Sequence, residues 1–244
     1  MKKIILSLWC IIFIASLLTI AIYAVDTDFK TTELPKEEWN DGWSNIRFRK
    51  AGDLNKIKGA IKSFDISESG EILLCLENNY ILILDNDGNR LKAFAYNSAG
   101  SSLAAWKGEN ILLFFWRGYL LVEISTDGQL LNMKEIDHSD VNNNDMLRKW
   151  QSTTQIESNG YTYIAENEGL FADMLSGNTH SKLTRIDVNG NSKTLYGSNN
   201  TQTSKVAVTV FIILLVNIIA PLATVIVVIK IRNKRKNKVR SLRG

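Results

Sequence analysis

The chain has 244 residues, of which 45% are hydrophobic and 22% are charged, and its formal net charge is +4. The charge is uneven: residues 2–3 and 230–243 carry ten of the 29 basic residues, so the segment between them holds 19 basic and 25 acidic residues, a formal charge of −6. This balance argues against a nucleic-acid partner, and the two cysteines are too few for a disulfide framework.

Residues 4–24 form an apolar run of 21 residues without a charge, preceded by Lys2 and Lys3. A helix of this length reaches roughly 31 Å, enough to cross a hydrocarbon core of about 30 Å. The alternative is a cleaved signal peptide ending at Ala24. The run exceeds the roughly 7 to 15 residues of a usual signal core, so we expect an uncleaved transmembrane anchor over residues 1–24.

Residues 206–229 form a second uncharged apolar run, of 24 residues, and predict a transmembrane helix. Pro221 cannot donate to the carbonyl of Asn217, four positions earlier. We expect a local kink at which Asn217 bonds nearby backbone; the alternative is a contact with another helix, from the first run or from a second copy.

Both ends of the chain are predicted to be cytoplasmic, because basic residues stay on that side of a membrane. Lys2 and Lys3 precede the first run, and eight basic residues follow the second in the tail 230–244. Residues 25–204 would then lie outside the cell membrane. If the first run is cleaved, the chain becomes single-pass with an extracytoplasmic N-terminus. We expect the tail to contact anionic lipid headgroups.

The outer segment contains three repeats of about 40 residues, each built from short apolar stretches separated by turn residues. In the first repeat, "EILLCLE", "YILILD" and "RLKAFAY" read as strands. Gly70 and Gly88 correspond to Gly108 and Gly128 in the second repeat. A third, looser repeat begins at Ser158, with Gly160 corresponding to Gly70, and contains an insertion over residues 168–180.

The stretch "DNDGNR", residues 85–90, resembles a calcium loop but predicts a hairpin turn. An EF-hand loop needs Gly at its sixth and Glu at its twelfth position, where this chain has Arg90 and Tyr96. Asp85 is replaced by Ser125 in the second repeat, whereas Gly after Asp or Asn persists. We therefore expect Gly88 to adopt a conformation that disfavours a Cβ atom, and Asp85→Asn to have little effect.

Over residues 61–196 the repeat resembles the β-propeller repeats of the NHL-like and quinoprotein-like kind. The resemblance implies an all-β, propeller-like domain of about three four-stranded antiparallel repeats. The alternatives are a β-sandwich or a single curved sheet, and three blades would leave edges for a partner or a second copy to cover. The stretch near Trp43 is expected to add a strand to the last blade or to begin a partial one.

The predicted organisation therefore has six parts: a transmembrane anchor or signal peptide over residues 1–24, a linker with a candidate first strand over 25–58, the repeat domain over 59–197, a tether over 198–205, a transmembrane helix over 206–229, and a basic tail over 230–244.

No residue is assigned a catalytic, cofactor-binding or metal-binding role. We expect His138 and His180 to be exposed loop histidines, and Cys75 to be a buried, inert thiol. The stretch "DHSDVNNND", residues 137–145, offers oxygen ligands for weak calcium binding but reads as a solvated connector. Trp39 and Trp43 are expected to pack on the domain, the alternative being the membrane interface.

These features favour a membrane-anchored protein with an extracytoplasmic binding or sensory domain, which binds a protein or an envelope component or associates with itself. The alternatives are a membrane-bound enzyme with a propeller-type catalytic domain and a structural subunit of a membrane complex. The richness in Ile, Lys and Asn, with only two prolines, suggests a bacterial chain.

The topology can be tested by proteolysis. Protease added to right-side-out vesicles is expected to digest residues 25–204 and to spare the basic tail 230–244. The fragments can be identified with tags at the two ends. A protected middle segment with a digested tail would reverse the predicted orientation.

Overall fold

The computed structural model describes residues 27–39, 44–98, 100–167 and 177–198, with residues 209, 210, 212, 213 and 217. The predicted transmembrane segment 4–24 lies outside the described residues, as does nearly all of 206–229. Among the residues that are described, no helix has both the length and the apolar character needed to cross a bilayer. The Asn217 amide donates to the carbonyl of Ile213 at 2.9 Å, the local bond expected from the sequence.

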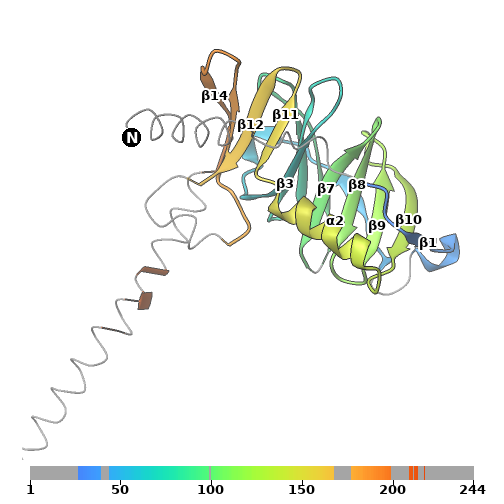
Figure 1. Ribbon diagram of the computed structural model, residues 1–244. Helices are drawn as coiled ribbons and strands as arrows, with labels where there is room; N and C mark the ends of the chain where they lie inside the picture. The colour runs from blue at the N-terminus through green and yellow to red at the C-terminus, as the bar shows by residue number, and fades with distance from the viewer. Residues whose placement is uncertain are drawn as a thin grey trace, which may run out of the picture.

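The described part of the outer segment is β-structure apart from one α-helix and short 3-10 helices, and every strand pair in it is antiparallel, as predicted (Figure 1). Each repeat forms one sheet whose four strands follow one another along the chain. The first sheet contains β3 (Ile61–Ile66), β4 (Ile72–Leu76), β5 (Tyr80–Leu84) and β6 (Arg90–Tyr96). The second contains β7 (Ser102–Lys107), β8 (Asn110–Phe115), β9 (Leu120–Ile124) and β10 (Leu130–Ile136). The third contains β11 (Gln155–Ser158), β12 (Tyr161–Glu166), β13 (Lys182–Ile186) and β14 (Ser192–Gly197).

Two short N-terminal strands extend the first two sheets to five strands. β1 (Thr31–Glu33) pairs with β10 of the second sheet, and β2 (Phe48–Lys50) pairs with β6 of the first. The expectation that the stretch near Trp43 would complete the last blade is therefore wrong. The alternative of a single curved sheet is also wrong, because the described strands form three separate sheets.

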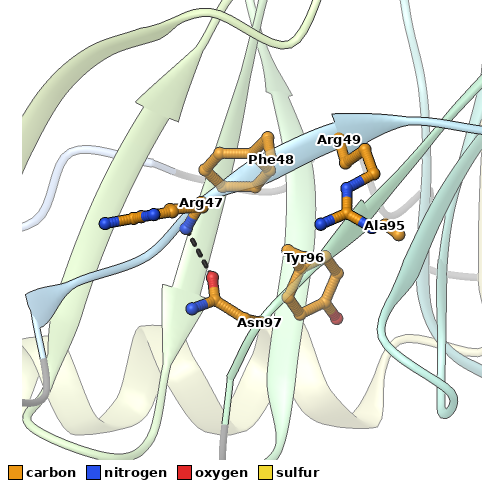
Figure 2. A pocket seen from close by; sticks show the side chains of 6 residues that line it. All are labelled: Arg47, Phe48, Arg49, Ala95, Tyr96 and Asn97. Carbon is orange, nitrogen blue, oxygen red and sulfur yellow. Dashed lines mark hydrogen bonds between the residues drawn. The ribbon is translucent and has the colours of Figure 1, made fainter.

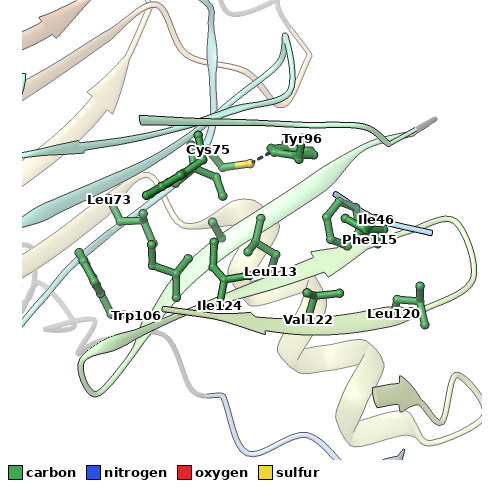
Figure 3. Close-up of a cluster of buried hydrophobic side chains, with 14 of the residues drawn as sticks. Ile46, Leu73, Cys75, Tyr96, Trp106, Leu113, Phe115, Leu120, Val122 and Ile124 are labelled. Atoms are coloured by element: carbon green, nitrogen blue, oxygen red, sulfur yellow. Dashed lines mark hydrogen bonds between the residues drawn. The ribbon is translucent and has the colours of Figure 1, made fainter. Parts of the chain in front are cut away.

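The sheets stack in an order that differs from their order in the chain. One buried cluster joins the first sheet to the second, through side chains such as Leu73 and Leu113 (Figure 3). Another joins the first sheet to the third, through side chains such as Leu74 and Leu183. The first sheet is therefore the middle layer, so the third blade does not follow the second as it would in a propeller.

The α-helix α2 (Val141–Ser152) covers the outer face of the second sheet, where a following blade would otherwise lie (Figure 1). Leu147 and Trp150 of the helix are buried in a third apolar cluster on that face. The sequence did not predict this helix, because "VNNND" at its start is polar. The carboxylate of Asp140 starts it by accepting from the backbone N–H groups of Asn142 and Asn143.

The third sheet ends the stack on its other side. In β12, Tyr163 and Ala165 are buried toward the first sheet. Thr162, Ile164 and Glu166 alternate with them along the strand and therefore point to the opposite, outer face of the third sheet. This mainly polar outer face is typical of the terminal unit of a stacked array.

Side chains of β3 hold the first sheet to the second. The Ser63 hydroxyl accepts from the Ala104 N–H at 2.8 Å, and the Asp65 carboxylate accepts from the Trp106 N–H at 2.8 Å. The indole of Trp150 donates to the carbonyl of Ala104 at 3.2 Å. These side chains satisfy the backbone of β7 where no neighbouring strand pairs with it.

The turn of residues 85–89 is the predicted hairpin, and Gly88 has a φ of +87°. The Asp85 carboxylate accepts from both the N–H and the side-chain amide of Asn89. These hydrogen bonds lower the pKa of Asp85. An asparagine could keep the first of these bonds, and the small effect expected of Asp85→Asn stays a prediction. Ser125 and Asp187 accept equivalent bonds in the other two repeats.

Gly88 and Gly190 give a matched test of how the sheets dock. Both have positive φ, but a Cβ at Gly88 would lie 2.7 Å from the Leu195 carbonyl of the third sheet, whereas one at Gly190 would meet nothing within 4 Å. Gly190→Ala is expected to lose roughly 1 kcal/mol of unfolding free energy through backbone strain alone. Gly88→Ala should lose about 1 to 3 kcal/mol more, because it overpacks a contact between sheets. Urea unfolding of residues 25–204 measures both, and equal losses would contradict this docking.

Asp65 should make stability depend on pH. It is buried, and burial raises its pKa from 3.8 to about 6, even though it accepts from two N–H groups. Between these values the unfolded chain loses the proton first, so the unfolding free energy should fall by about 2 kcal/mol as pH rises from 4 to 6, and by about 3 kcal/mol over the whole titration.

Urea unfolding at several pH values checks this, with Asp65→Asn as the control. That variant places a side-chain NH2 group against a backbone N–H, so it is expected to be less stable at every pH. Its unfolding free energy should not show the fall between pH 4 and 6. An unchanged slope in Asp65→Asn would contradict the assignment.

Candidate ligand groove

The N-terminal segment of residues 47–57 forms a groove along the outer edge of the first sheet. Its first cavity, of about 430 Å³, is lined by Arg47, Phe48, Arg49, Ala95, Tyr96 and Asn97 (Figure 2). A second, of about 460 Å³, shares Arg49 and Ala95 and extends to Lys56 and Tyr80. The two cavities therefore adjoin along β2.

Backbone pairing fixes the groove at the β2 end. Arg47 donates its N–H to the Asn97 side chain at 2.5 Å, and Asn97 donates its N–H to the Arg47 carbonyl at 3.3 Å (Figure 2). The pairing of Arg49 with Ala95 continues the same ladder. The backbone of both arginines is thus held by the sheet and not by a free loop.

The far end of the groove is closed by a short 3-10 helix, η3 (Leu54–Lys56). Asp53 caps it by accepting from the Asn55 N–H at 3.1 Å. The Arg90 guanidinium donates to the carbonyls of Leu54 and Ile57, and so anchors this segment to β6.

The groove has an excess of positive charge. Asp53 is paired with Lys56 at 3.3 Å. The exposed side chains of Arg47, Arg49 and Lys50 have no carboxylate partner in the part of the chain that the structure describes. Guanidinium groups hold carboxylates and phosphates through paired hydrogen bonds, so the groove suits an acidic group.

The aromatic lining gives the first cavity an apolar wall. The rings of Phe48 and Tyr96 lie 6.1 Å apart and tilted by 46°. Figure 2 shows both rings beside the two arginines. An acidic ligand that also carries a ring or an apolar group would match this combination.

The Tyr96 hydroxyl points away from the groove into the core, where it hydrogen-bonds the Ser102 hydroxyl and lies 3.6 Å from Cys75 Sγ. Burial raises the pKa of Tyr96 and that of the Cys75 thiol. The predicted burial of Cys75 is confirmed. Since a thiol with a raised pKa is a poor nucleophile, this cluster is structural.

The two histidines lie apart from the groove. His138 is exposed, as expected, and its ring centroid lies 5.2 Å from that of Tyr119. His180 is not the exposed loop residue that was expected: it is partly buried, and its backbone N–H and carbonyl pair with Ile61 at 2.8 and 2.7 Å.

The oxygen-rich stretch 137–145 is used for local structure. Asp137 accepts from the N–H and hydroxyl of Ser139 at 3.0 and 2.6 Å, and Asp140 caps α2. Across residues 27–39, 44–98, 100–167 and 177–198, no three His, Cys, Asp or Glu side chains gather as metal ligands would. Trp39 packs on the core as predicted, whereas Trp43 lies outside the described residues.

A smaller cavity, of about 170 Å³, lies on the second sheet beside residues 27–31. Its lysines are already paired, Lys107 with Glu123 at 2.8 Å and Lys134 with Glu33 at 2.6 Å. A charged ligand there would have to compete with these ion pairs, which makes the groove on the first sheet the stronger site.

Comparison with known proteins assigns no family. No protein-family profile and no curated protein matches the chain. One similar solved structure is a protein of unknown function from Bacteroides caccae, at 15% identity and a TM-score of 0.27, covering 57% of this chain and 49% of that chain. Another is a streptogramin B lyase, at 12% identity and a TM-score of 0.25, covering 63% of this chain and 46% of that chain. The chain thus spans about half the length of each.

The sequence did not identify Arg47 and Arg49 as site residues, although "NIRFRK" has a visible signal. The basic residues alternate with Phe48 in an otherwise acidic segment, a pattern that also occurs on protected edge strands. Only the pairing of β2 with β6 shows that these side chains line a cavity.

Proposed function

We propose that the protein is a membrane-tethered extracytoplasmic binding module whose groove holds an acidic group of a protein or envelope component. The observation that carries this proposal is the pair of arginines, Arg47 and Arg49, lining a cavity without a described carboxylate partner. The membrane placement rests on the apolar runs 4–24 and 206–229 and on the basic residues beside them.

The charge balance supports an acidic ligand. The segment between the apolar runs is acidic overall, so an uncompensated basic groove within it is a local exception. Long-range repulsion by the rest of the domain would weaken non-specific binding of acids, so that the groove selects ligands by close contact.

Site-specific photo-crosslinking in native membranes tests the proposal. A photoreactive residue at Gly52, where a Cβ would meet nothing within 4 Å, is expected to capture a partner. The control position is Val188, which is 84% exposed and lies in the turn of the third sheet. Equal capture at both positions would contradict a specific groove.

Charge-removing variants sharpen the test. Replacing both Arg47 and Arg49 with Gln should lower capture at Gly52 tenfold or more, since each charged hydrogen bond contributes about 1.5 to 3 kcal/mol. Arg148→Gln on α2 is the matched control, because Arg148 is exposed and lies outside the groove. Competition by polyglutamate or by polyphosphate would separate carboxylate from phosphate recognition, and full capture by the double variant would refute the assignment.

A further inference from the structure

The two ends of the stacked sheets differ in charge. We define the acidic end of the stack as the turns at residues 67–70, 85–89, 108–109, 125–129, 159–160 and 187–191. These turns hold six acidic side chains and no lysine or arginine: Glu68, Asp85, Asp87, Glu109, Asp127 and Asp187. Two of the six are paired with basic side chains of the strands, Asp127 with Lys92 and Asp87 with Arg185 and Lys193, which leaves four acidic side chains without an ion pair in the described part of the chain.

The opposite end, called here the aromatic end, consists of the turns 77–79 and 116–119 and the segments 58–60 and 137–141. On the second sheet it displays a chain of ring contacts. Tyr119 lies 6.3 Å from Trp116 and 5.2 Å from His138, measured between ring centroids. Val141, which follows in the same segment, is 71% exposed.

Tyr119 occupies a strained position. Its φ is +52°, in the left-handed region that disfavours residues with a bulky side chain. The same position in the first sheet is Asn79, with a φ of +61°, and asparagine tolerates this region better. Tyr119 is partly buried and, with Trp116, packs against the third apolar cluster, so that its side chain holds the turn on the core and leaves part of the ring at the surface.

Basic side chains surround these rings. Arg117 and Lys58 are exposed and have no described carboxylate partner. Lys58 belongs to this end because its carbonyl accepts from the Asn78 side chain at 2.7 Å. The nearby Asp137 and Asp140 are already paired with Lys30, at 3.7 and 3.4 Å. Glu77 also belongs to this end, so Arg117 and Lys58 are two exposed basic side chains beside the rings and not the sign of a net positive charge.

The chain also leaves the domain at this end. Ser198 donates its N–H to the carbonyl of Ser181 at 2.7 Å, beside the start of β13. Seven residues, 199–205, separate it from the apolar run that begins at residue 206. Fully extended, they reach only about 25 Å, so the domain must stay close to the bilayer.

We propose that the aromatic end lies against the bilayer, with Trp116 and Tyr119 at the headgroup level and Arg117 and Lys58 on anionic headgroups. Tryptophan and tyrosine favour this interface because one part of each ring is apolar and another can hydrogen-bond. Anionic headgroups attract the basic side chains and repel the turns of the acidic end, which then face away. The proposal depends on the membrane topology of the proposed function but not on the groove.

The test uses the full chain with Cys10→Ser in liposomes, which contain no other protein. A fluorophore is attached at Val141→Cys or, as the control at the acidic end, at Val188→Cys; the native Cys75 is buried. Lipids with a nitroxide on the headgroup are expected to quench the first fluorophore at least twice as strongly as the second. Phosphatidylglycerol should strengthen this difference relative to phosphatidylcholine alone.

Two variants separate lipid contact from folding. Tyr119→Asn introduces the residue type of the equivalent turn and is expected to fold, and together with Lys58→Glu it should lower the quenching at position 141. Arg148→Glu, on the exposed surface of α2, should leave it unchanged. Equal quenching at both positions, or stronger quenching at 188, would overturn the proposal. A water-soluble quencher enclosed in the liposomes shows whether the domain lies inside or outside them, which tests the topology. Crosslinking at Gly52 tests the groove separately, so a failure of the topology, of the groove or of the lipid contact can be distinguished.

Discussion

The contact between β3 and β7 is the interaction on which the rest of the architecture depends. Ser63 and Asp65 satisfy backbone groups of β7 that no strand pairs with, and both bonds are buried. Burying an acidic side chain is costly unless its oxygens are hydrogen-bonded, and both Asp65 oxygens accept an N–H. The contact holds the second sheet against the first, and it couples the stability of the stack to the protonation of Asp65.

Placing the first sheet in the middle has a consequence for the groove. The second and third sheets cover the two faces of the first, so that its outer edge is where the N-terminal segment can add β2. A strand added there carries Arg47 and Arg49 on a rigid ladder, bordered by the Tyr96 ring. A fixed backbone spares a binding site the entropy cost of ordering a loop.

The stack is closed at its ends by two different means, which explains why three repeats suffice without a ring. Helix α2 covers the second sheet with Leu147 and Trp150, and the third sheet turns a mainly polar face outward. Between the layers the hairpin turns dock on the neighbouring sheet: Gly128 lies against Phe94, and Gly88 lies against Leu195. Gly190, in the terminal sheet, meets nothing in the described structure. Replacing the turn glycine is therefore expected to lower the unfolding free energy by a different amount in each repeat.

The sequence by itself determined the local features: the antiparallel strands, the hairpin at Gly88 and the burial of Cys75, because periodicity, turn chemistry and hydrophobicity are properties of neighbouring residues. The apolar runs 4–24 and 206–229 remain predictions. Tertiary structure alone decided the order of the sheets, the sheet that β2 joins and the helical state of the polar stretch after Asp140. These outcomes depend on contacts such as Ser63 with Ala104 and Trp150 with Ala104, between residues about 40 positions or more apart. Arg47 and Arg49 became candidate site residues for the same reason: a single sequence shows that they alternate on a strand, but not which strand lies beside it.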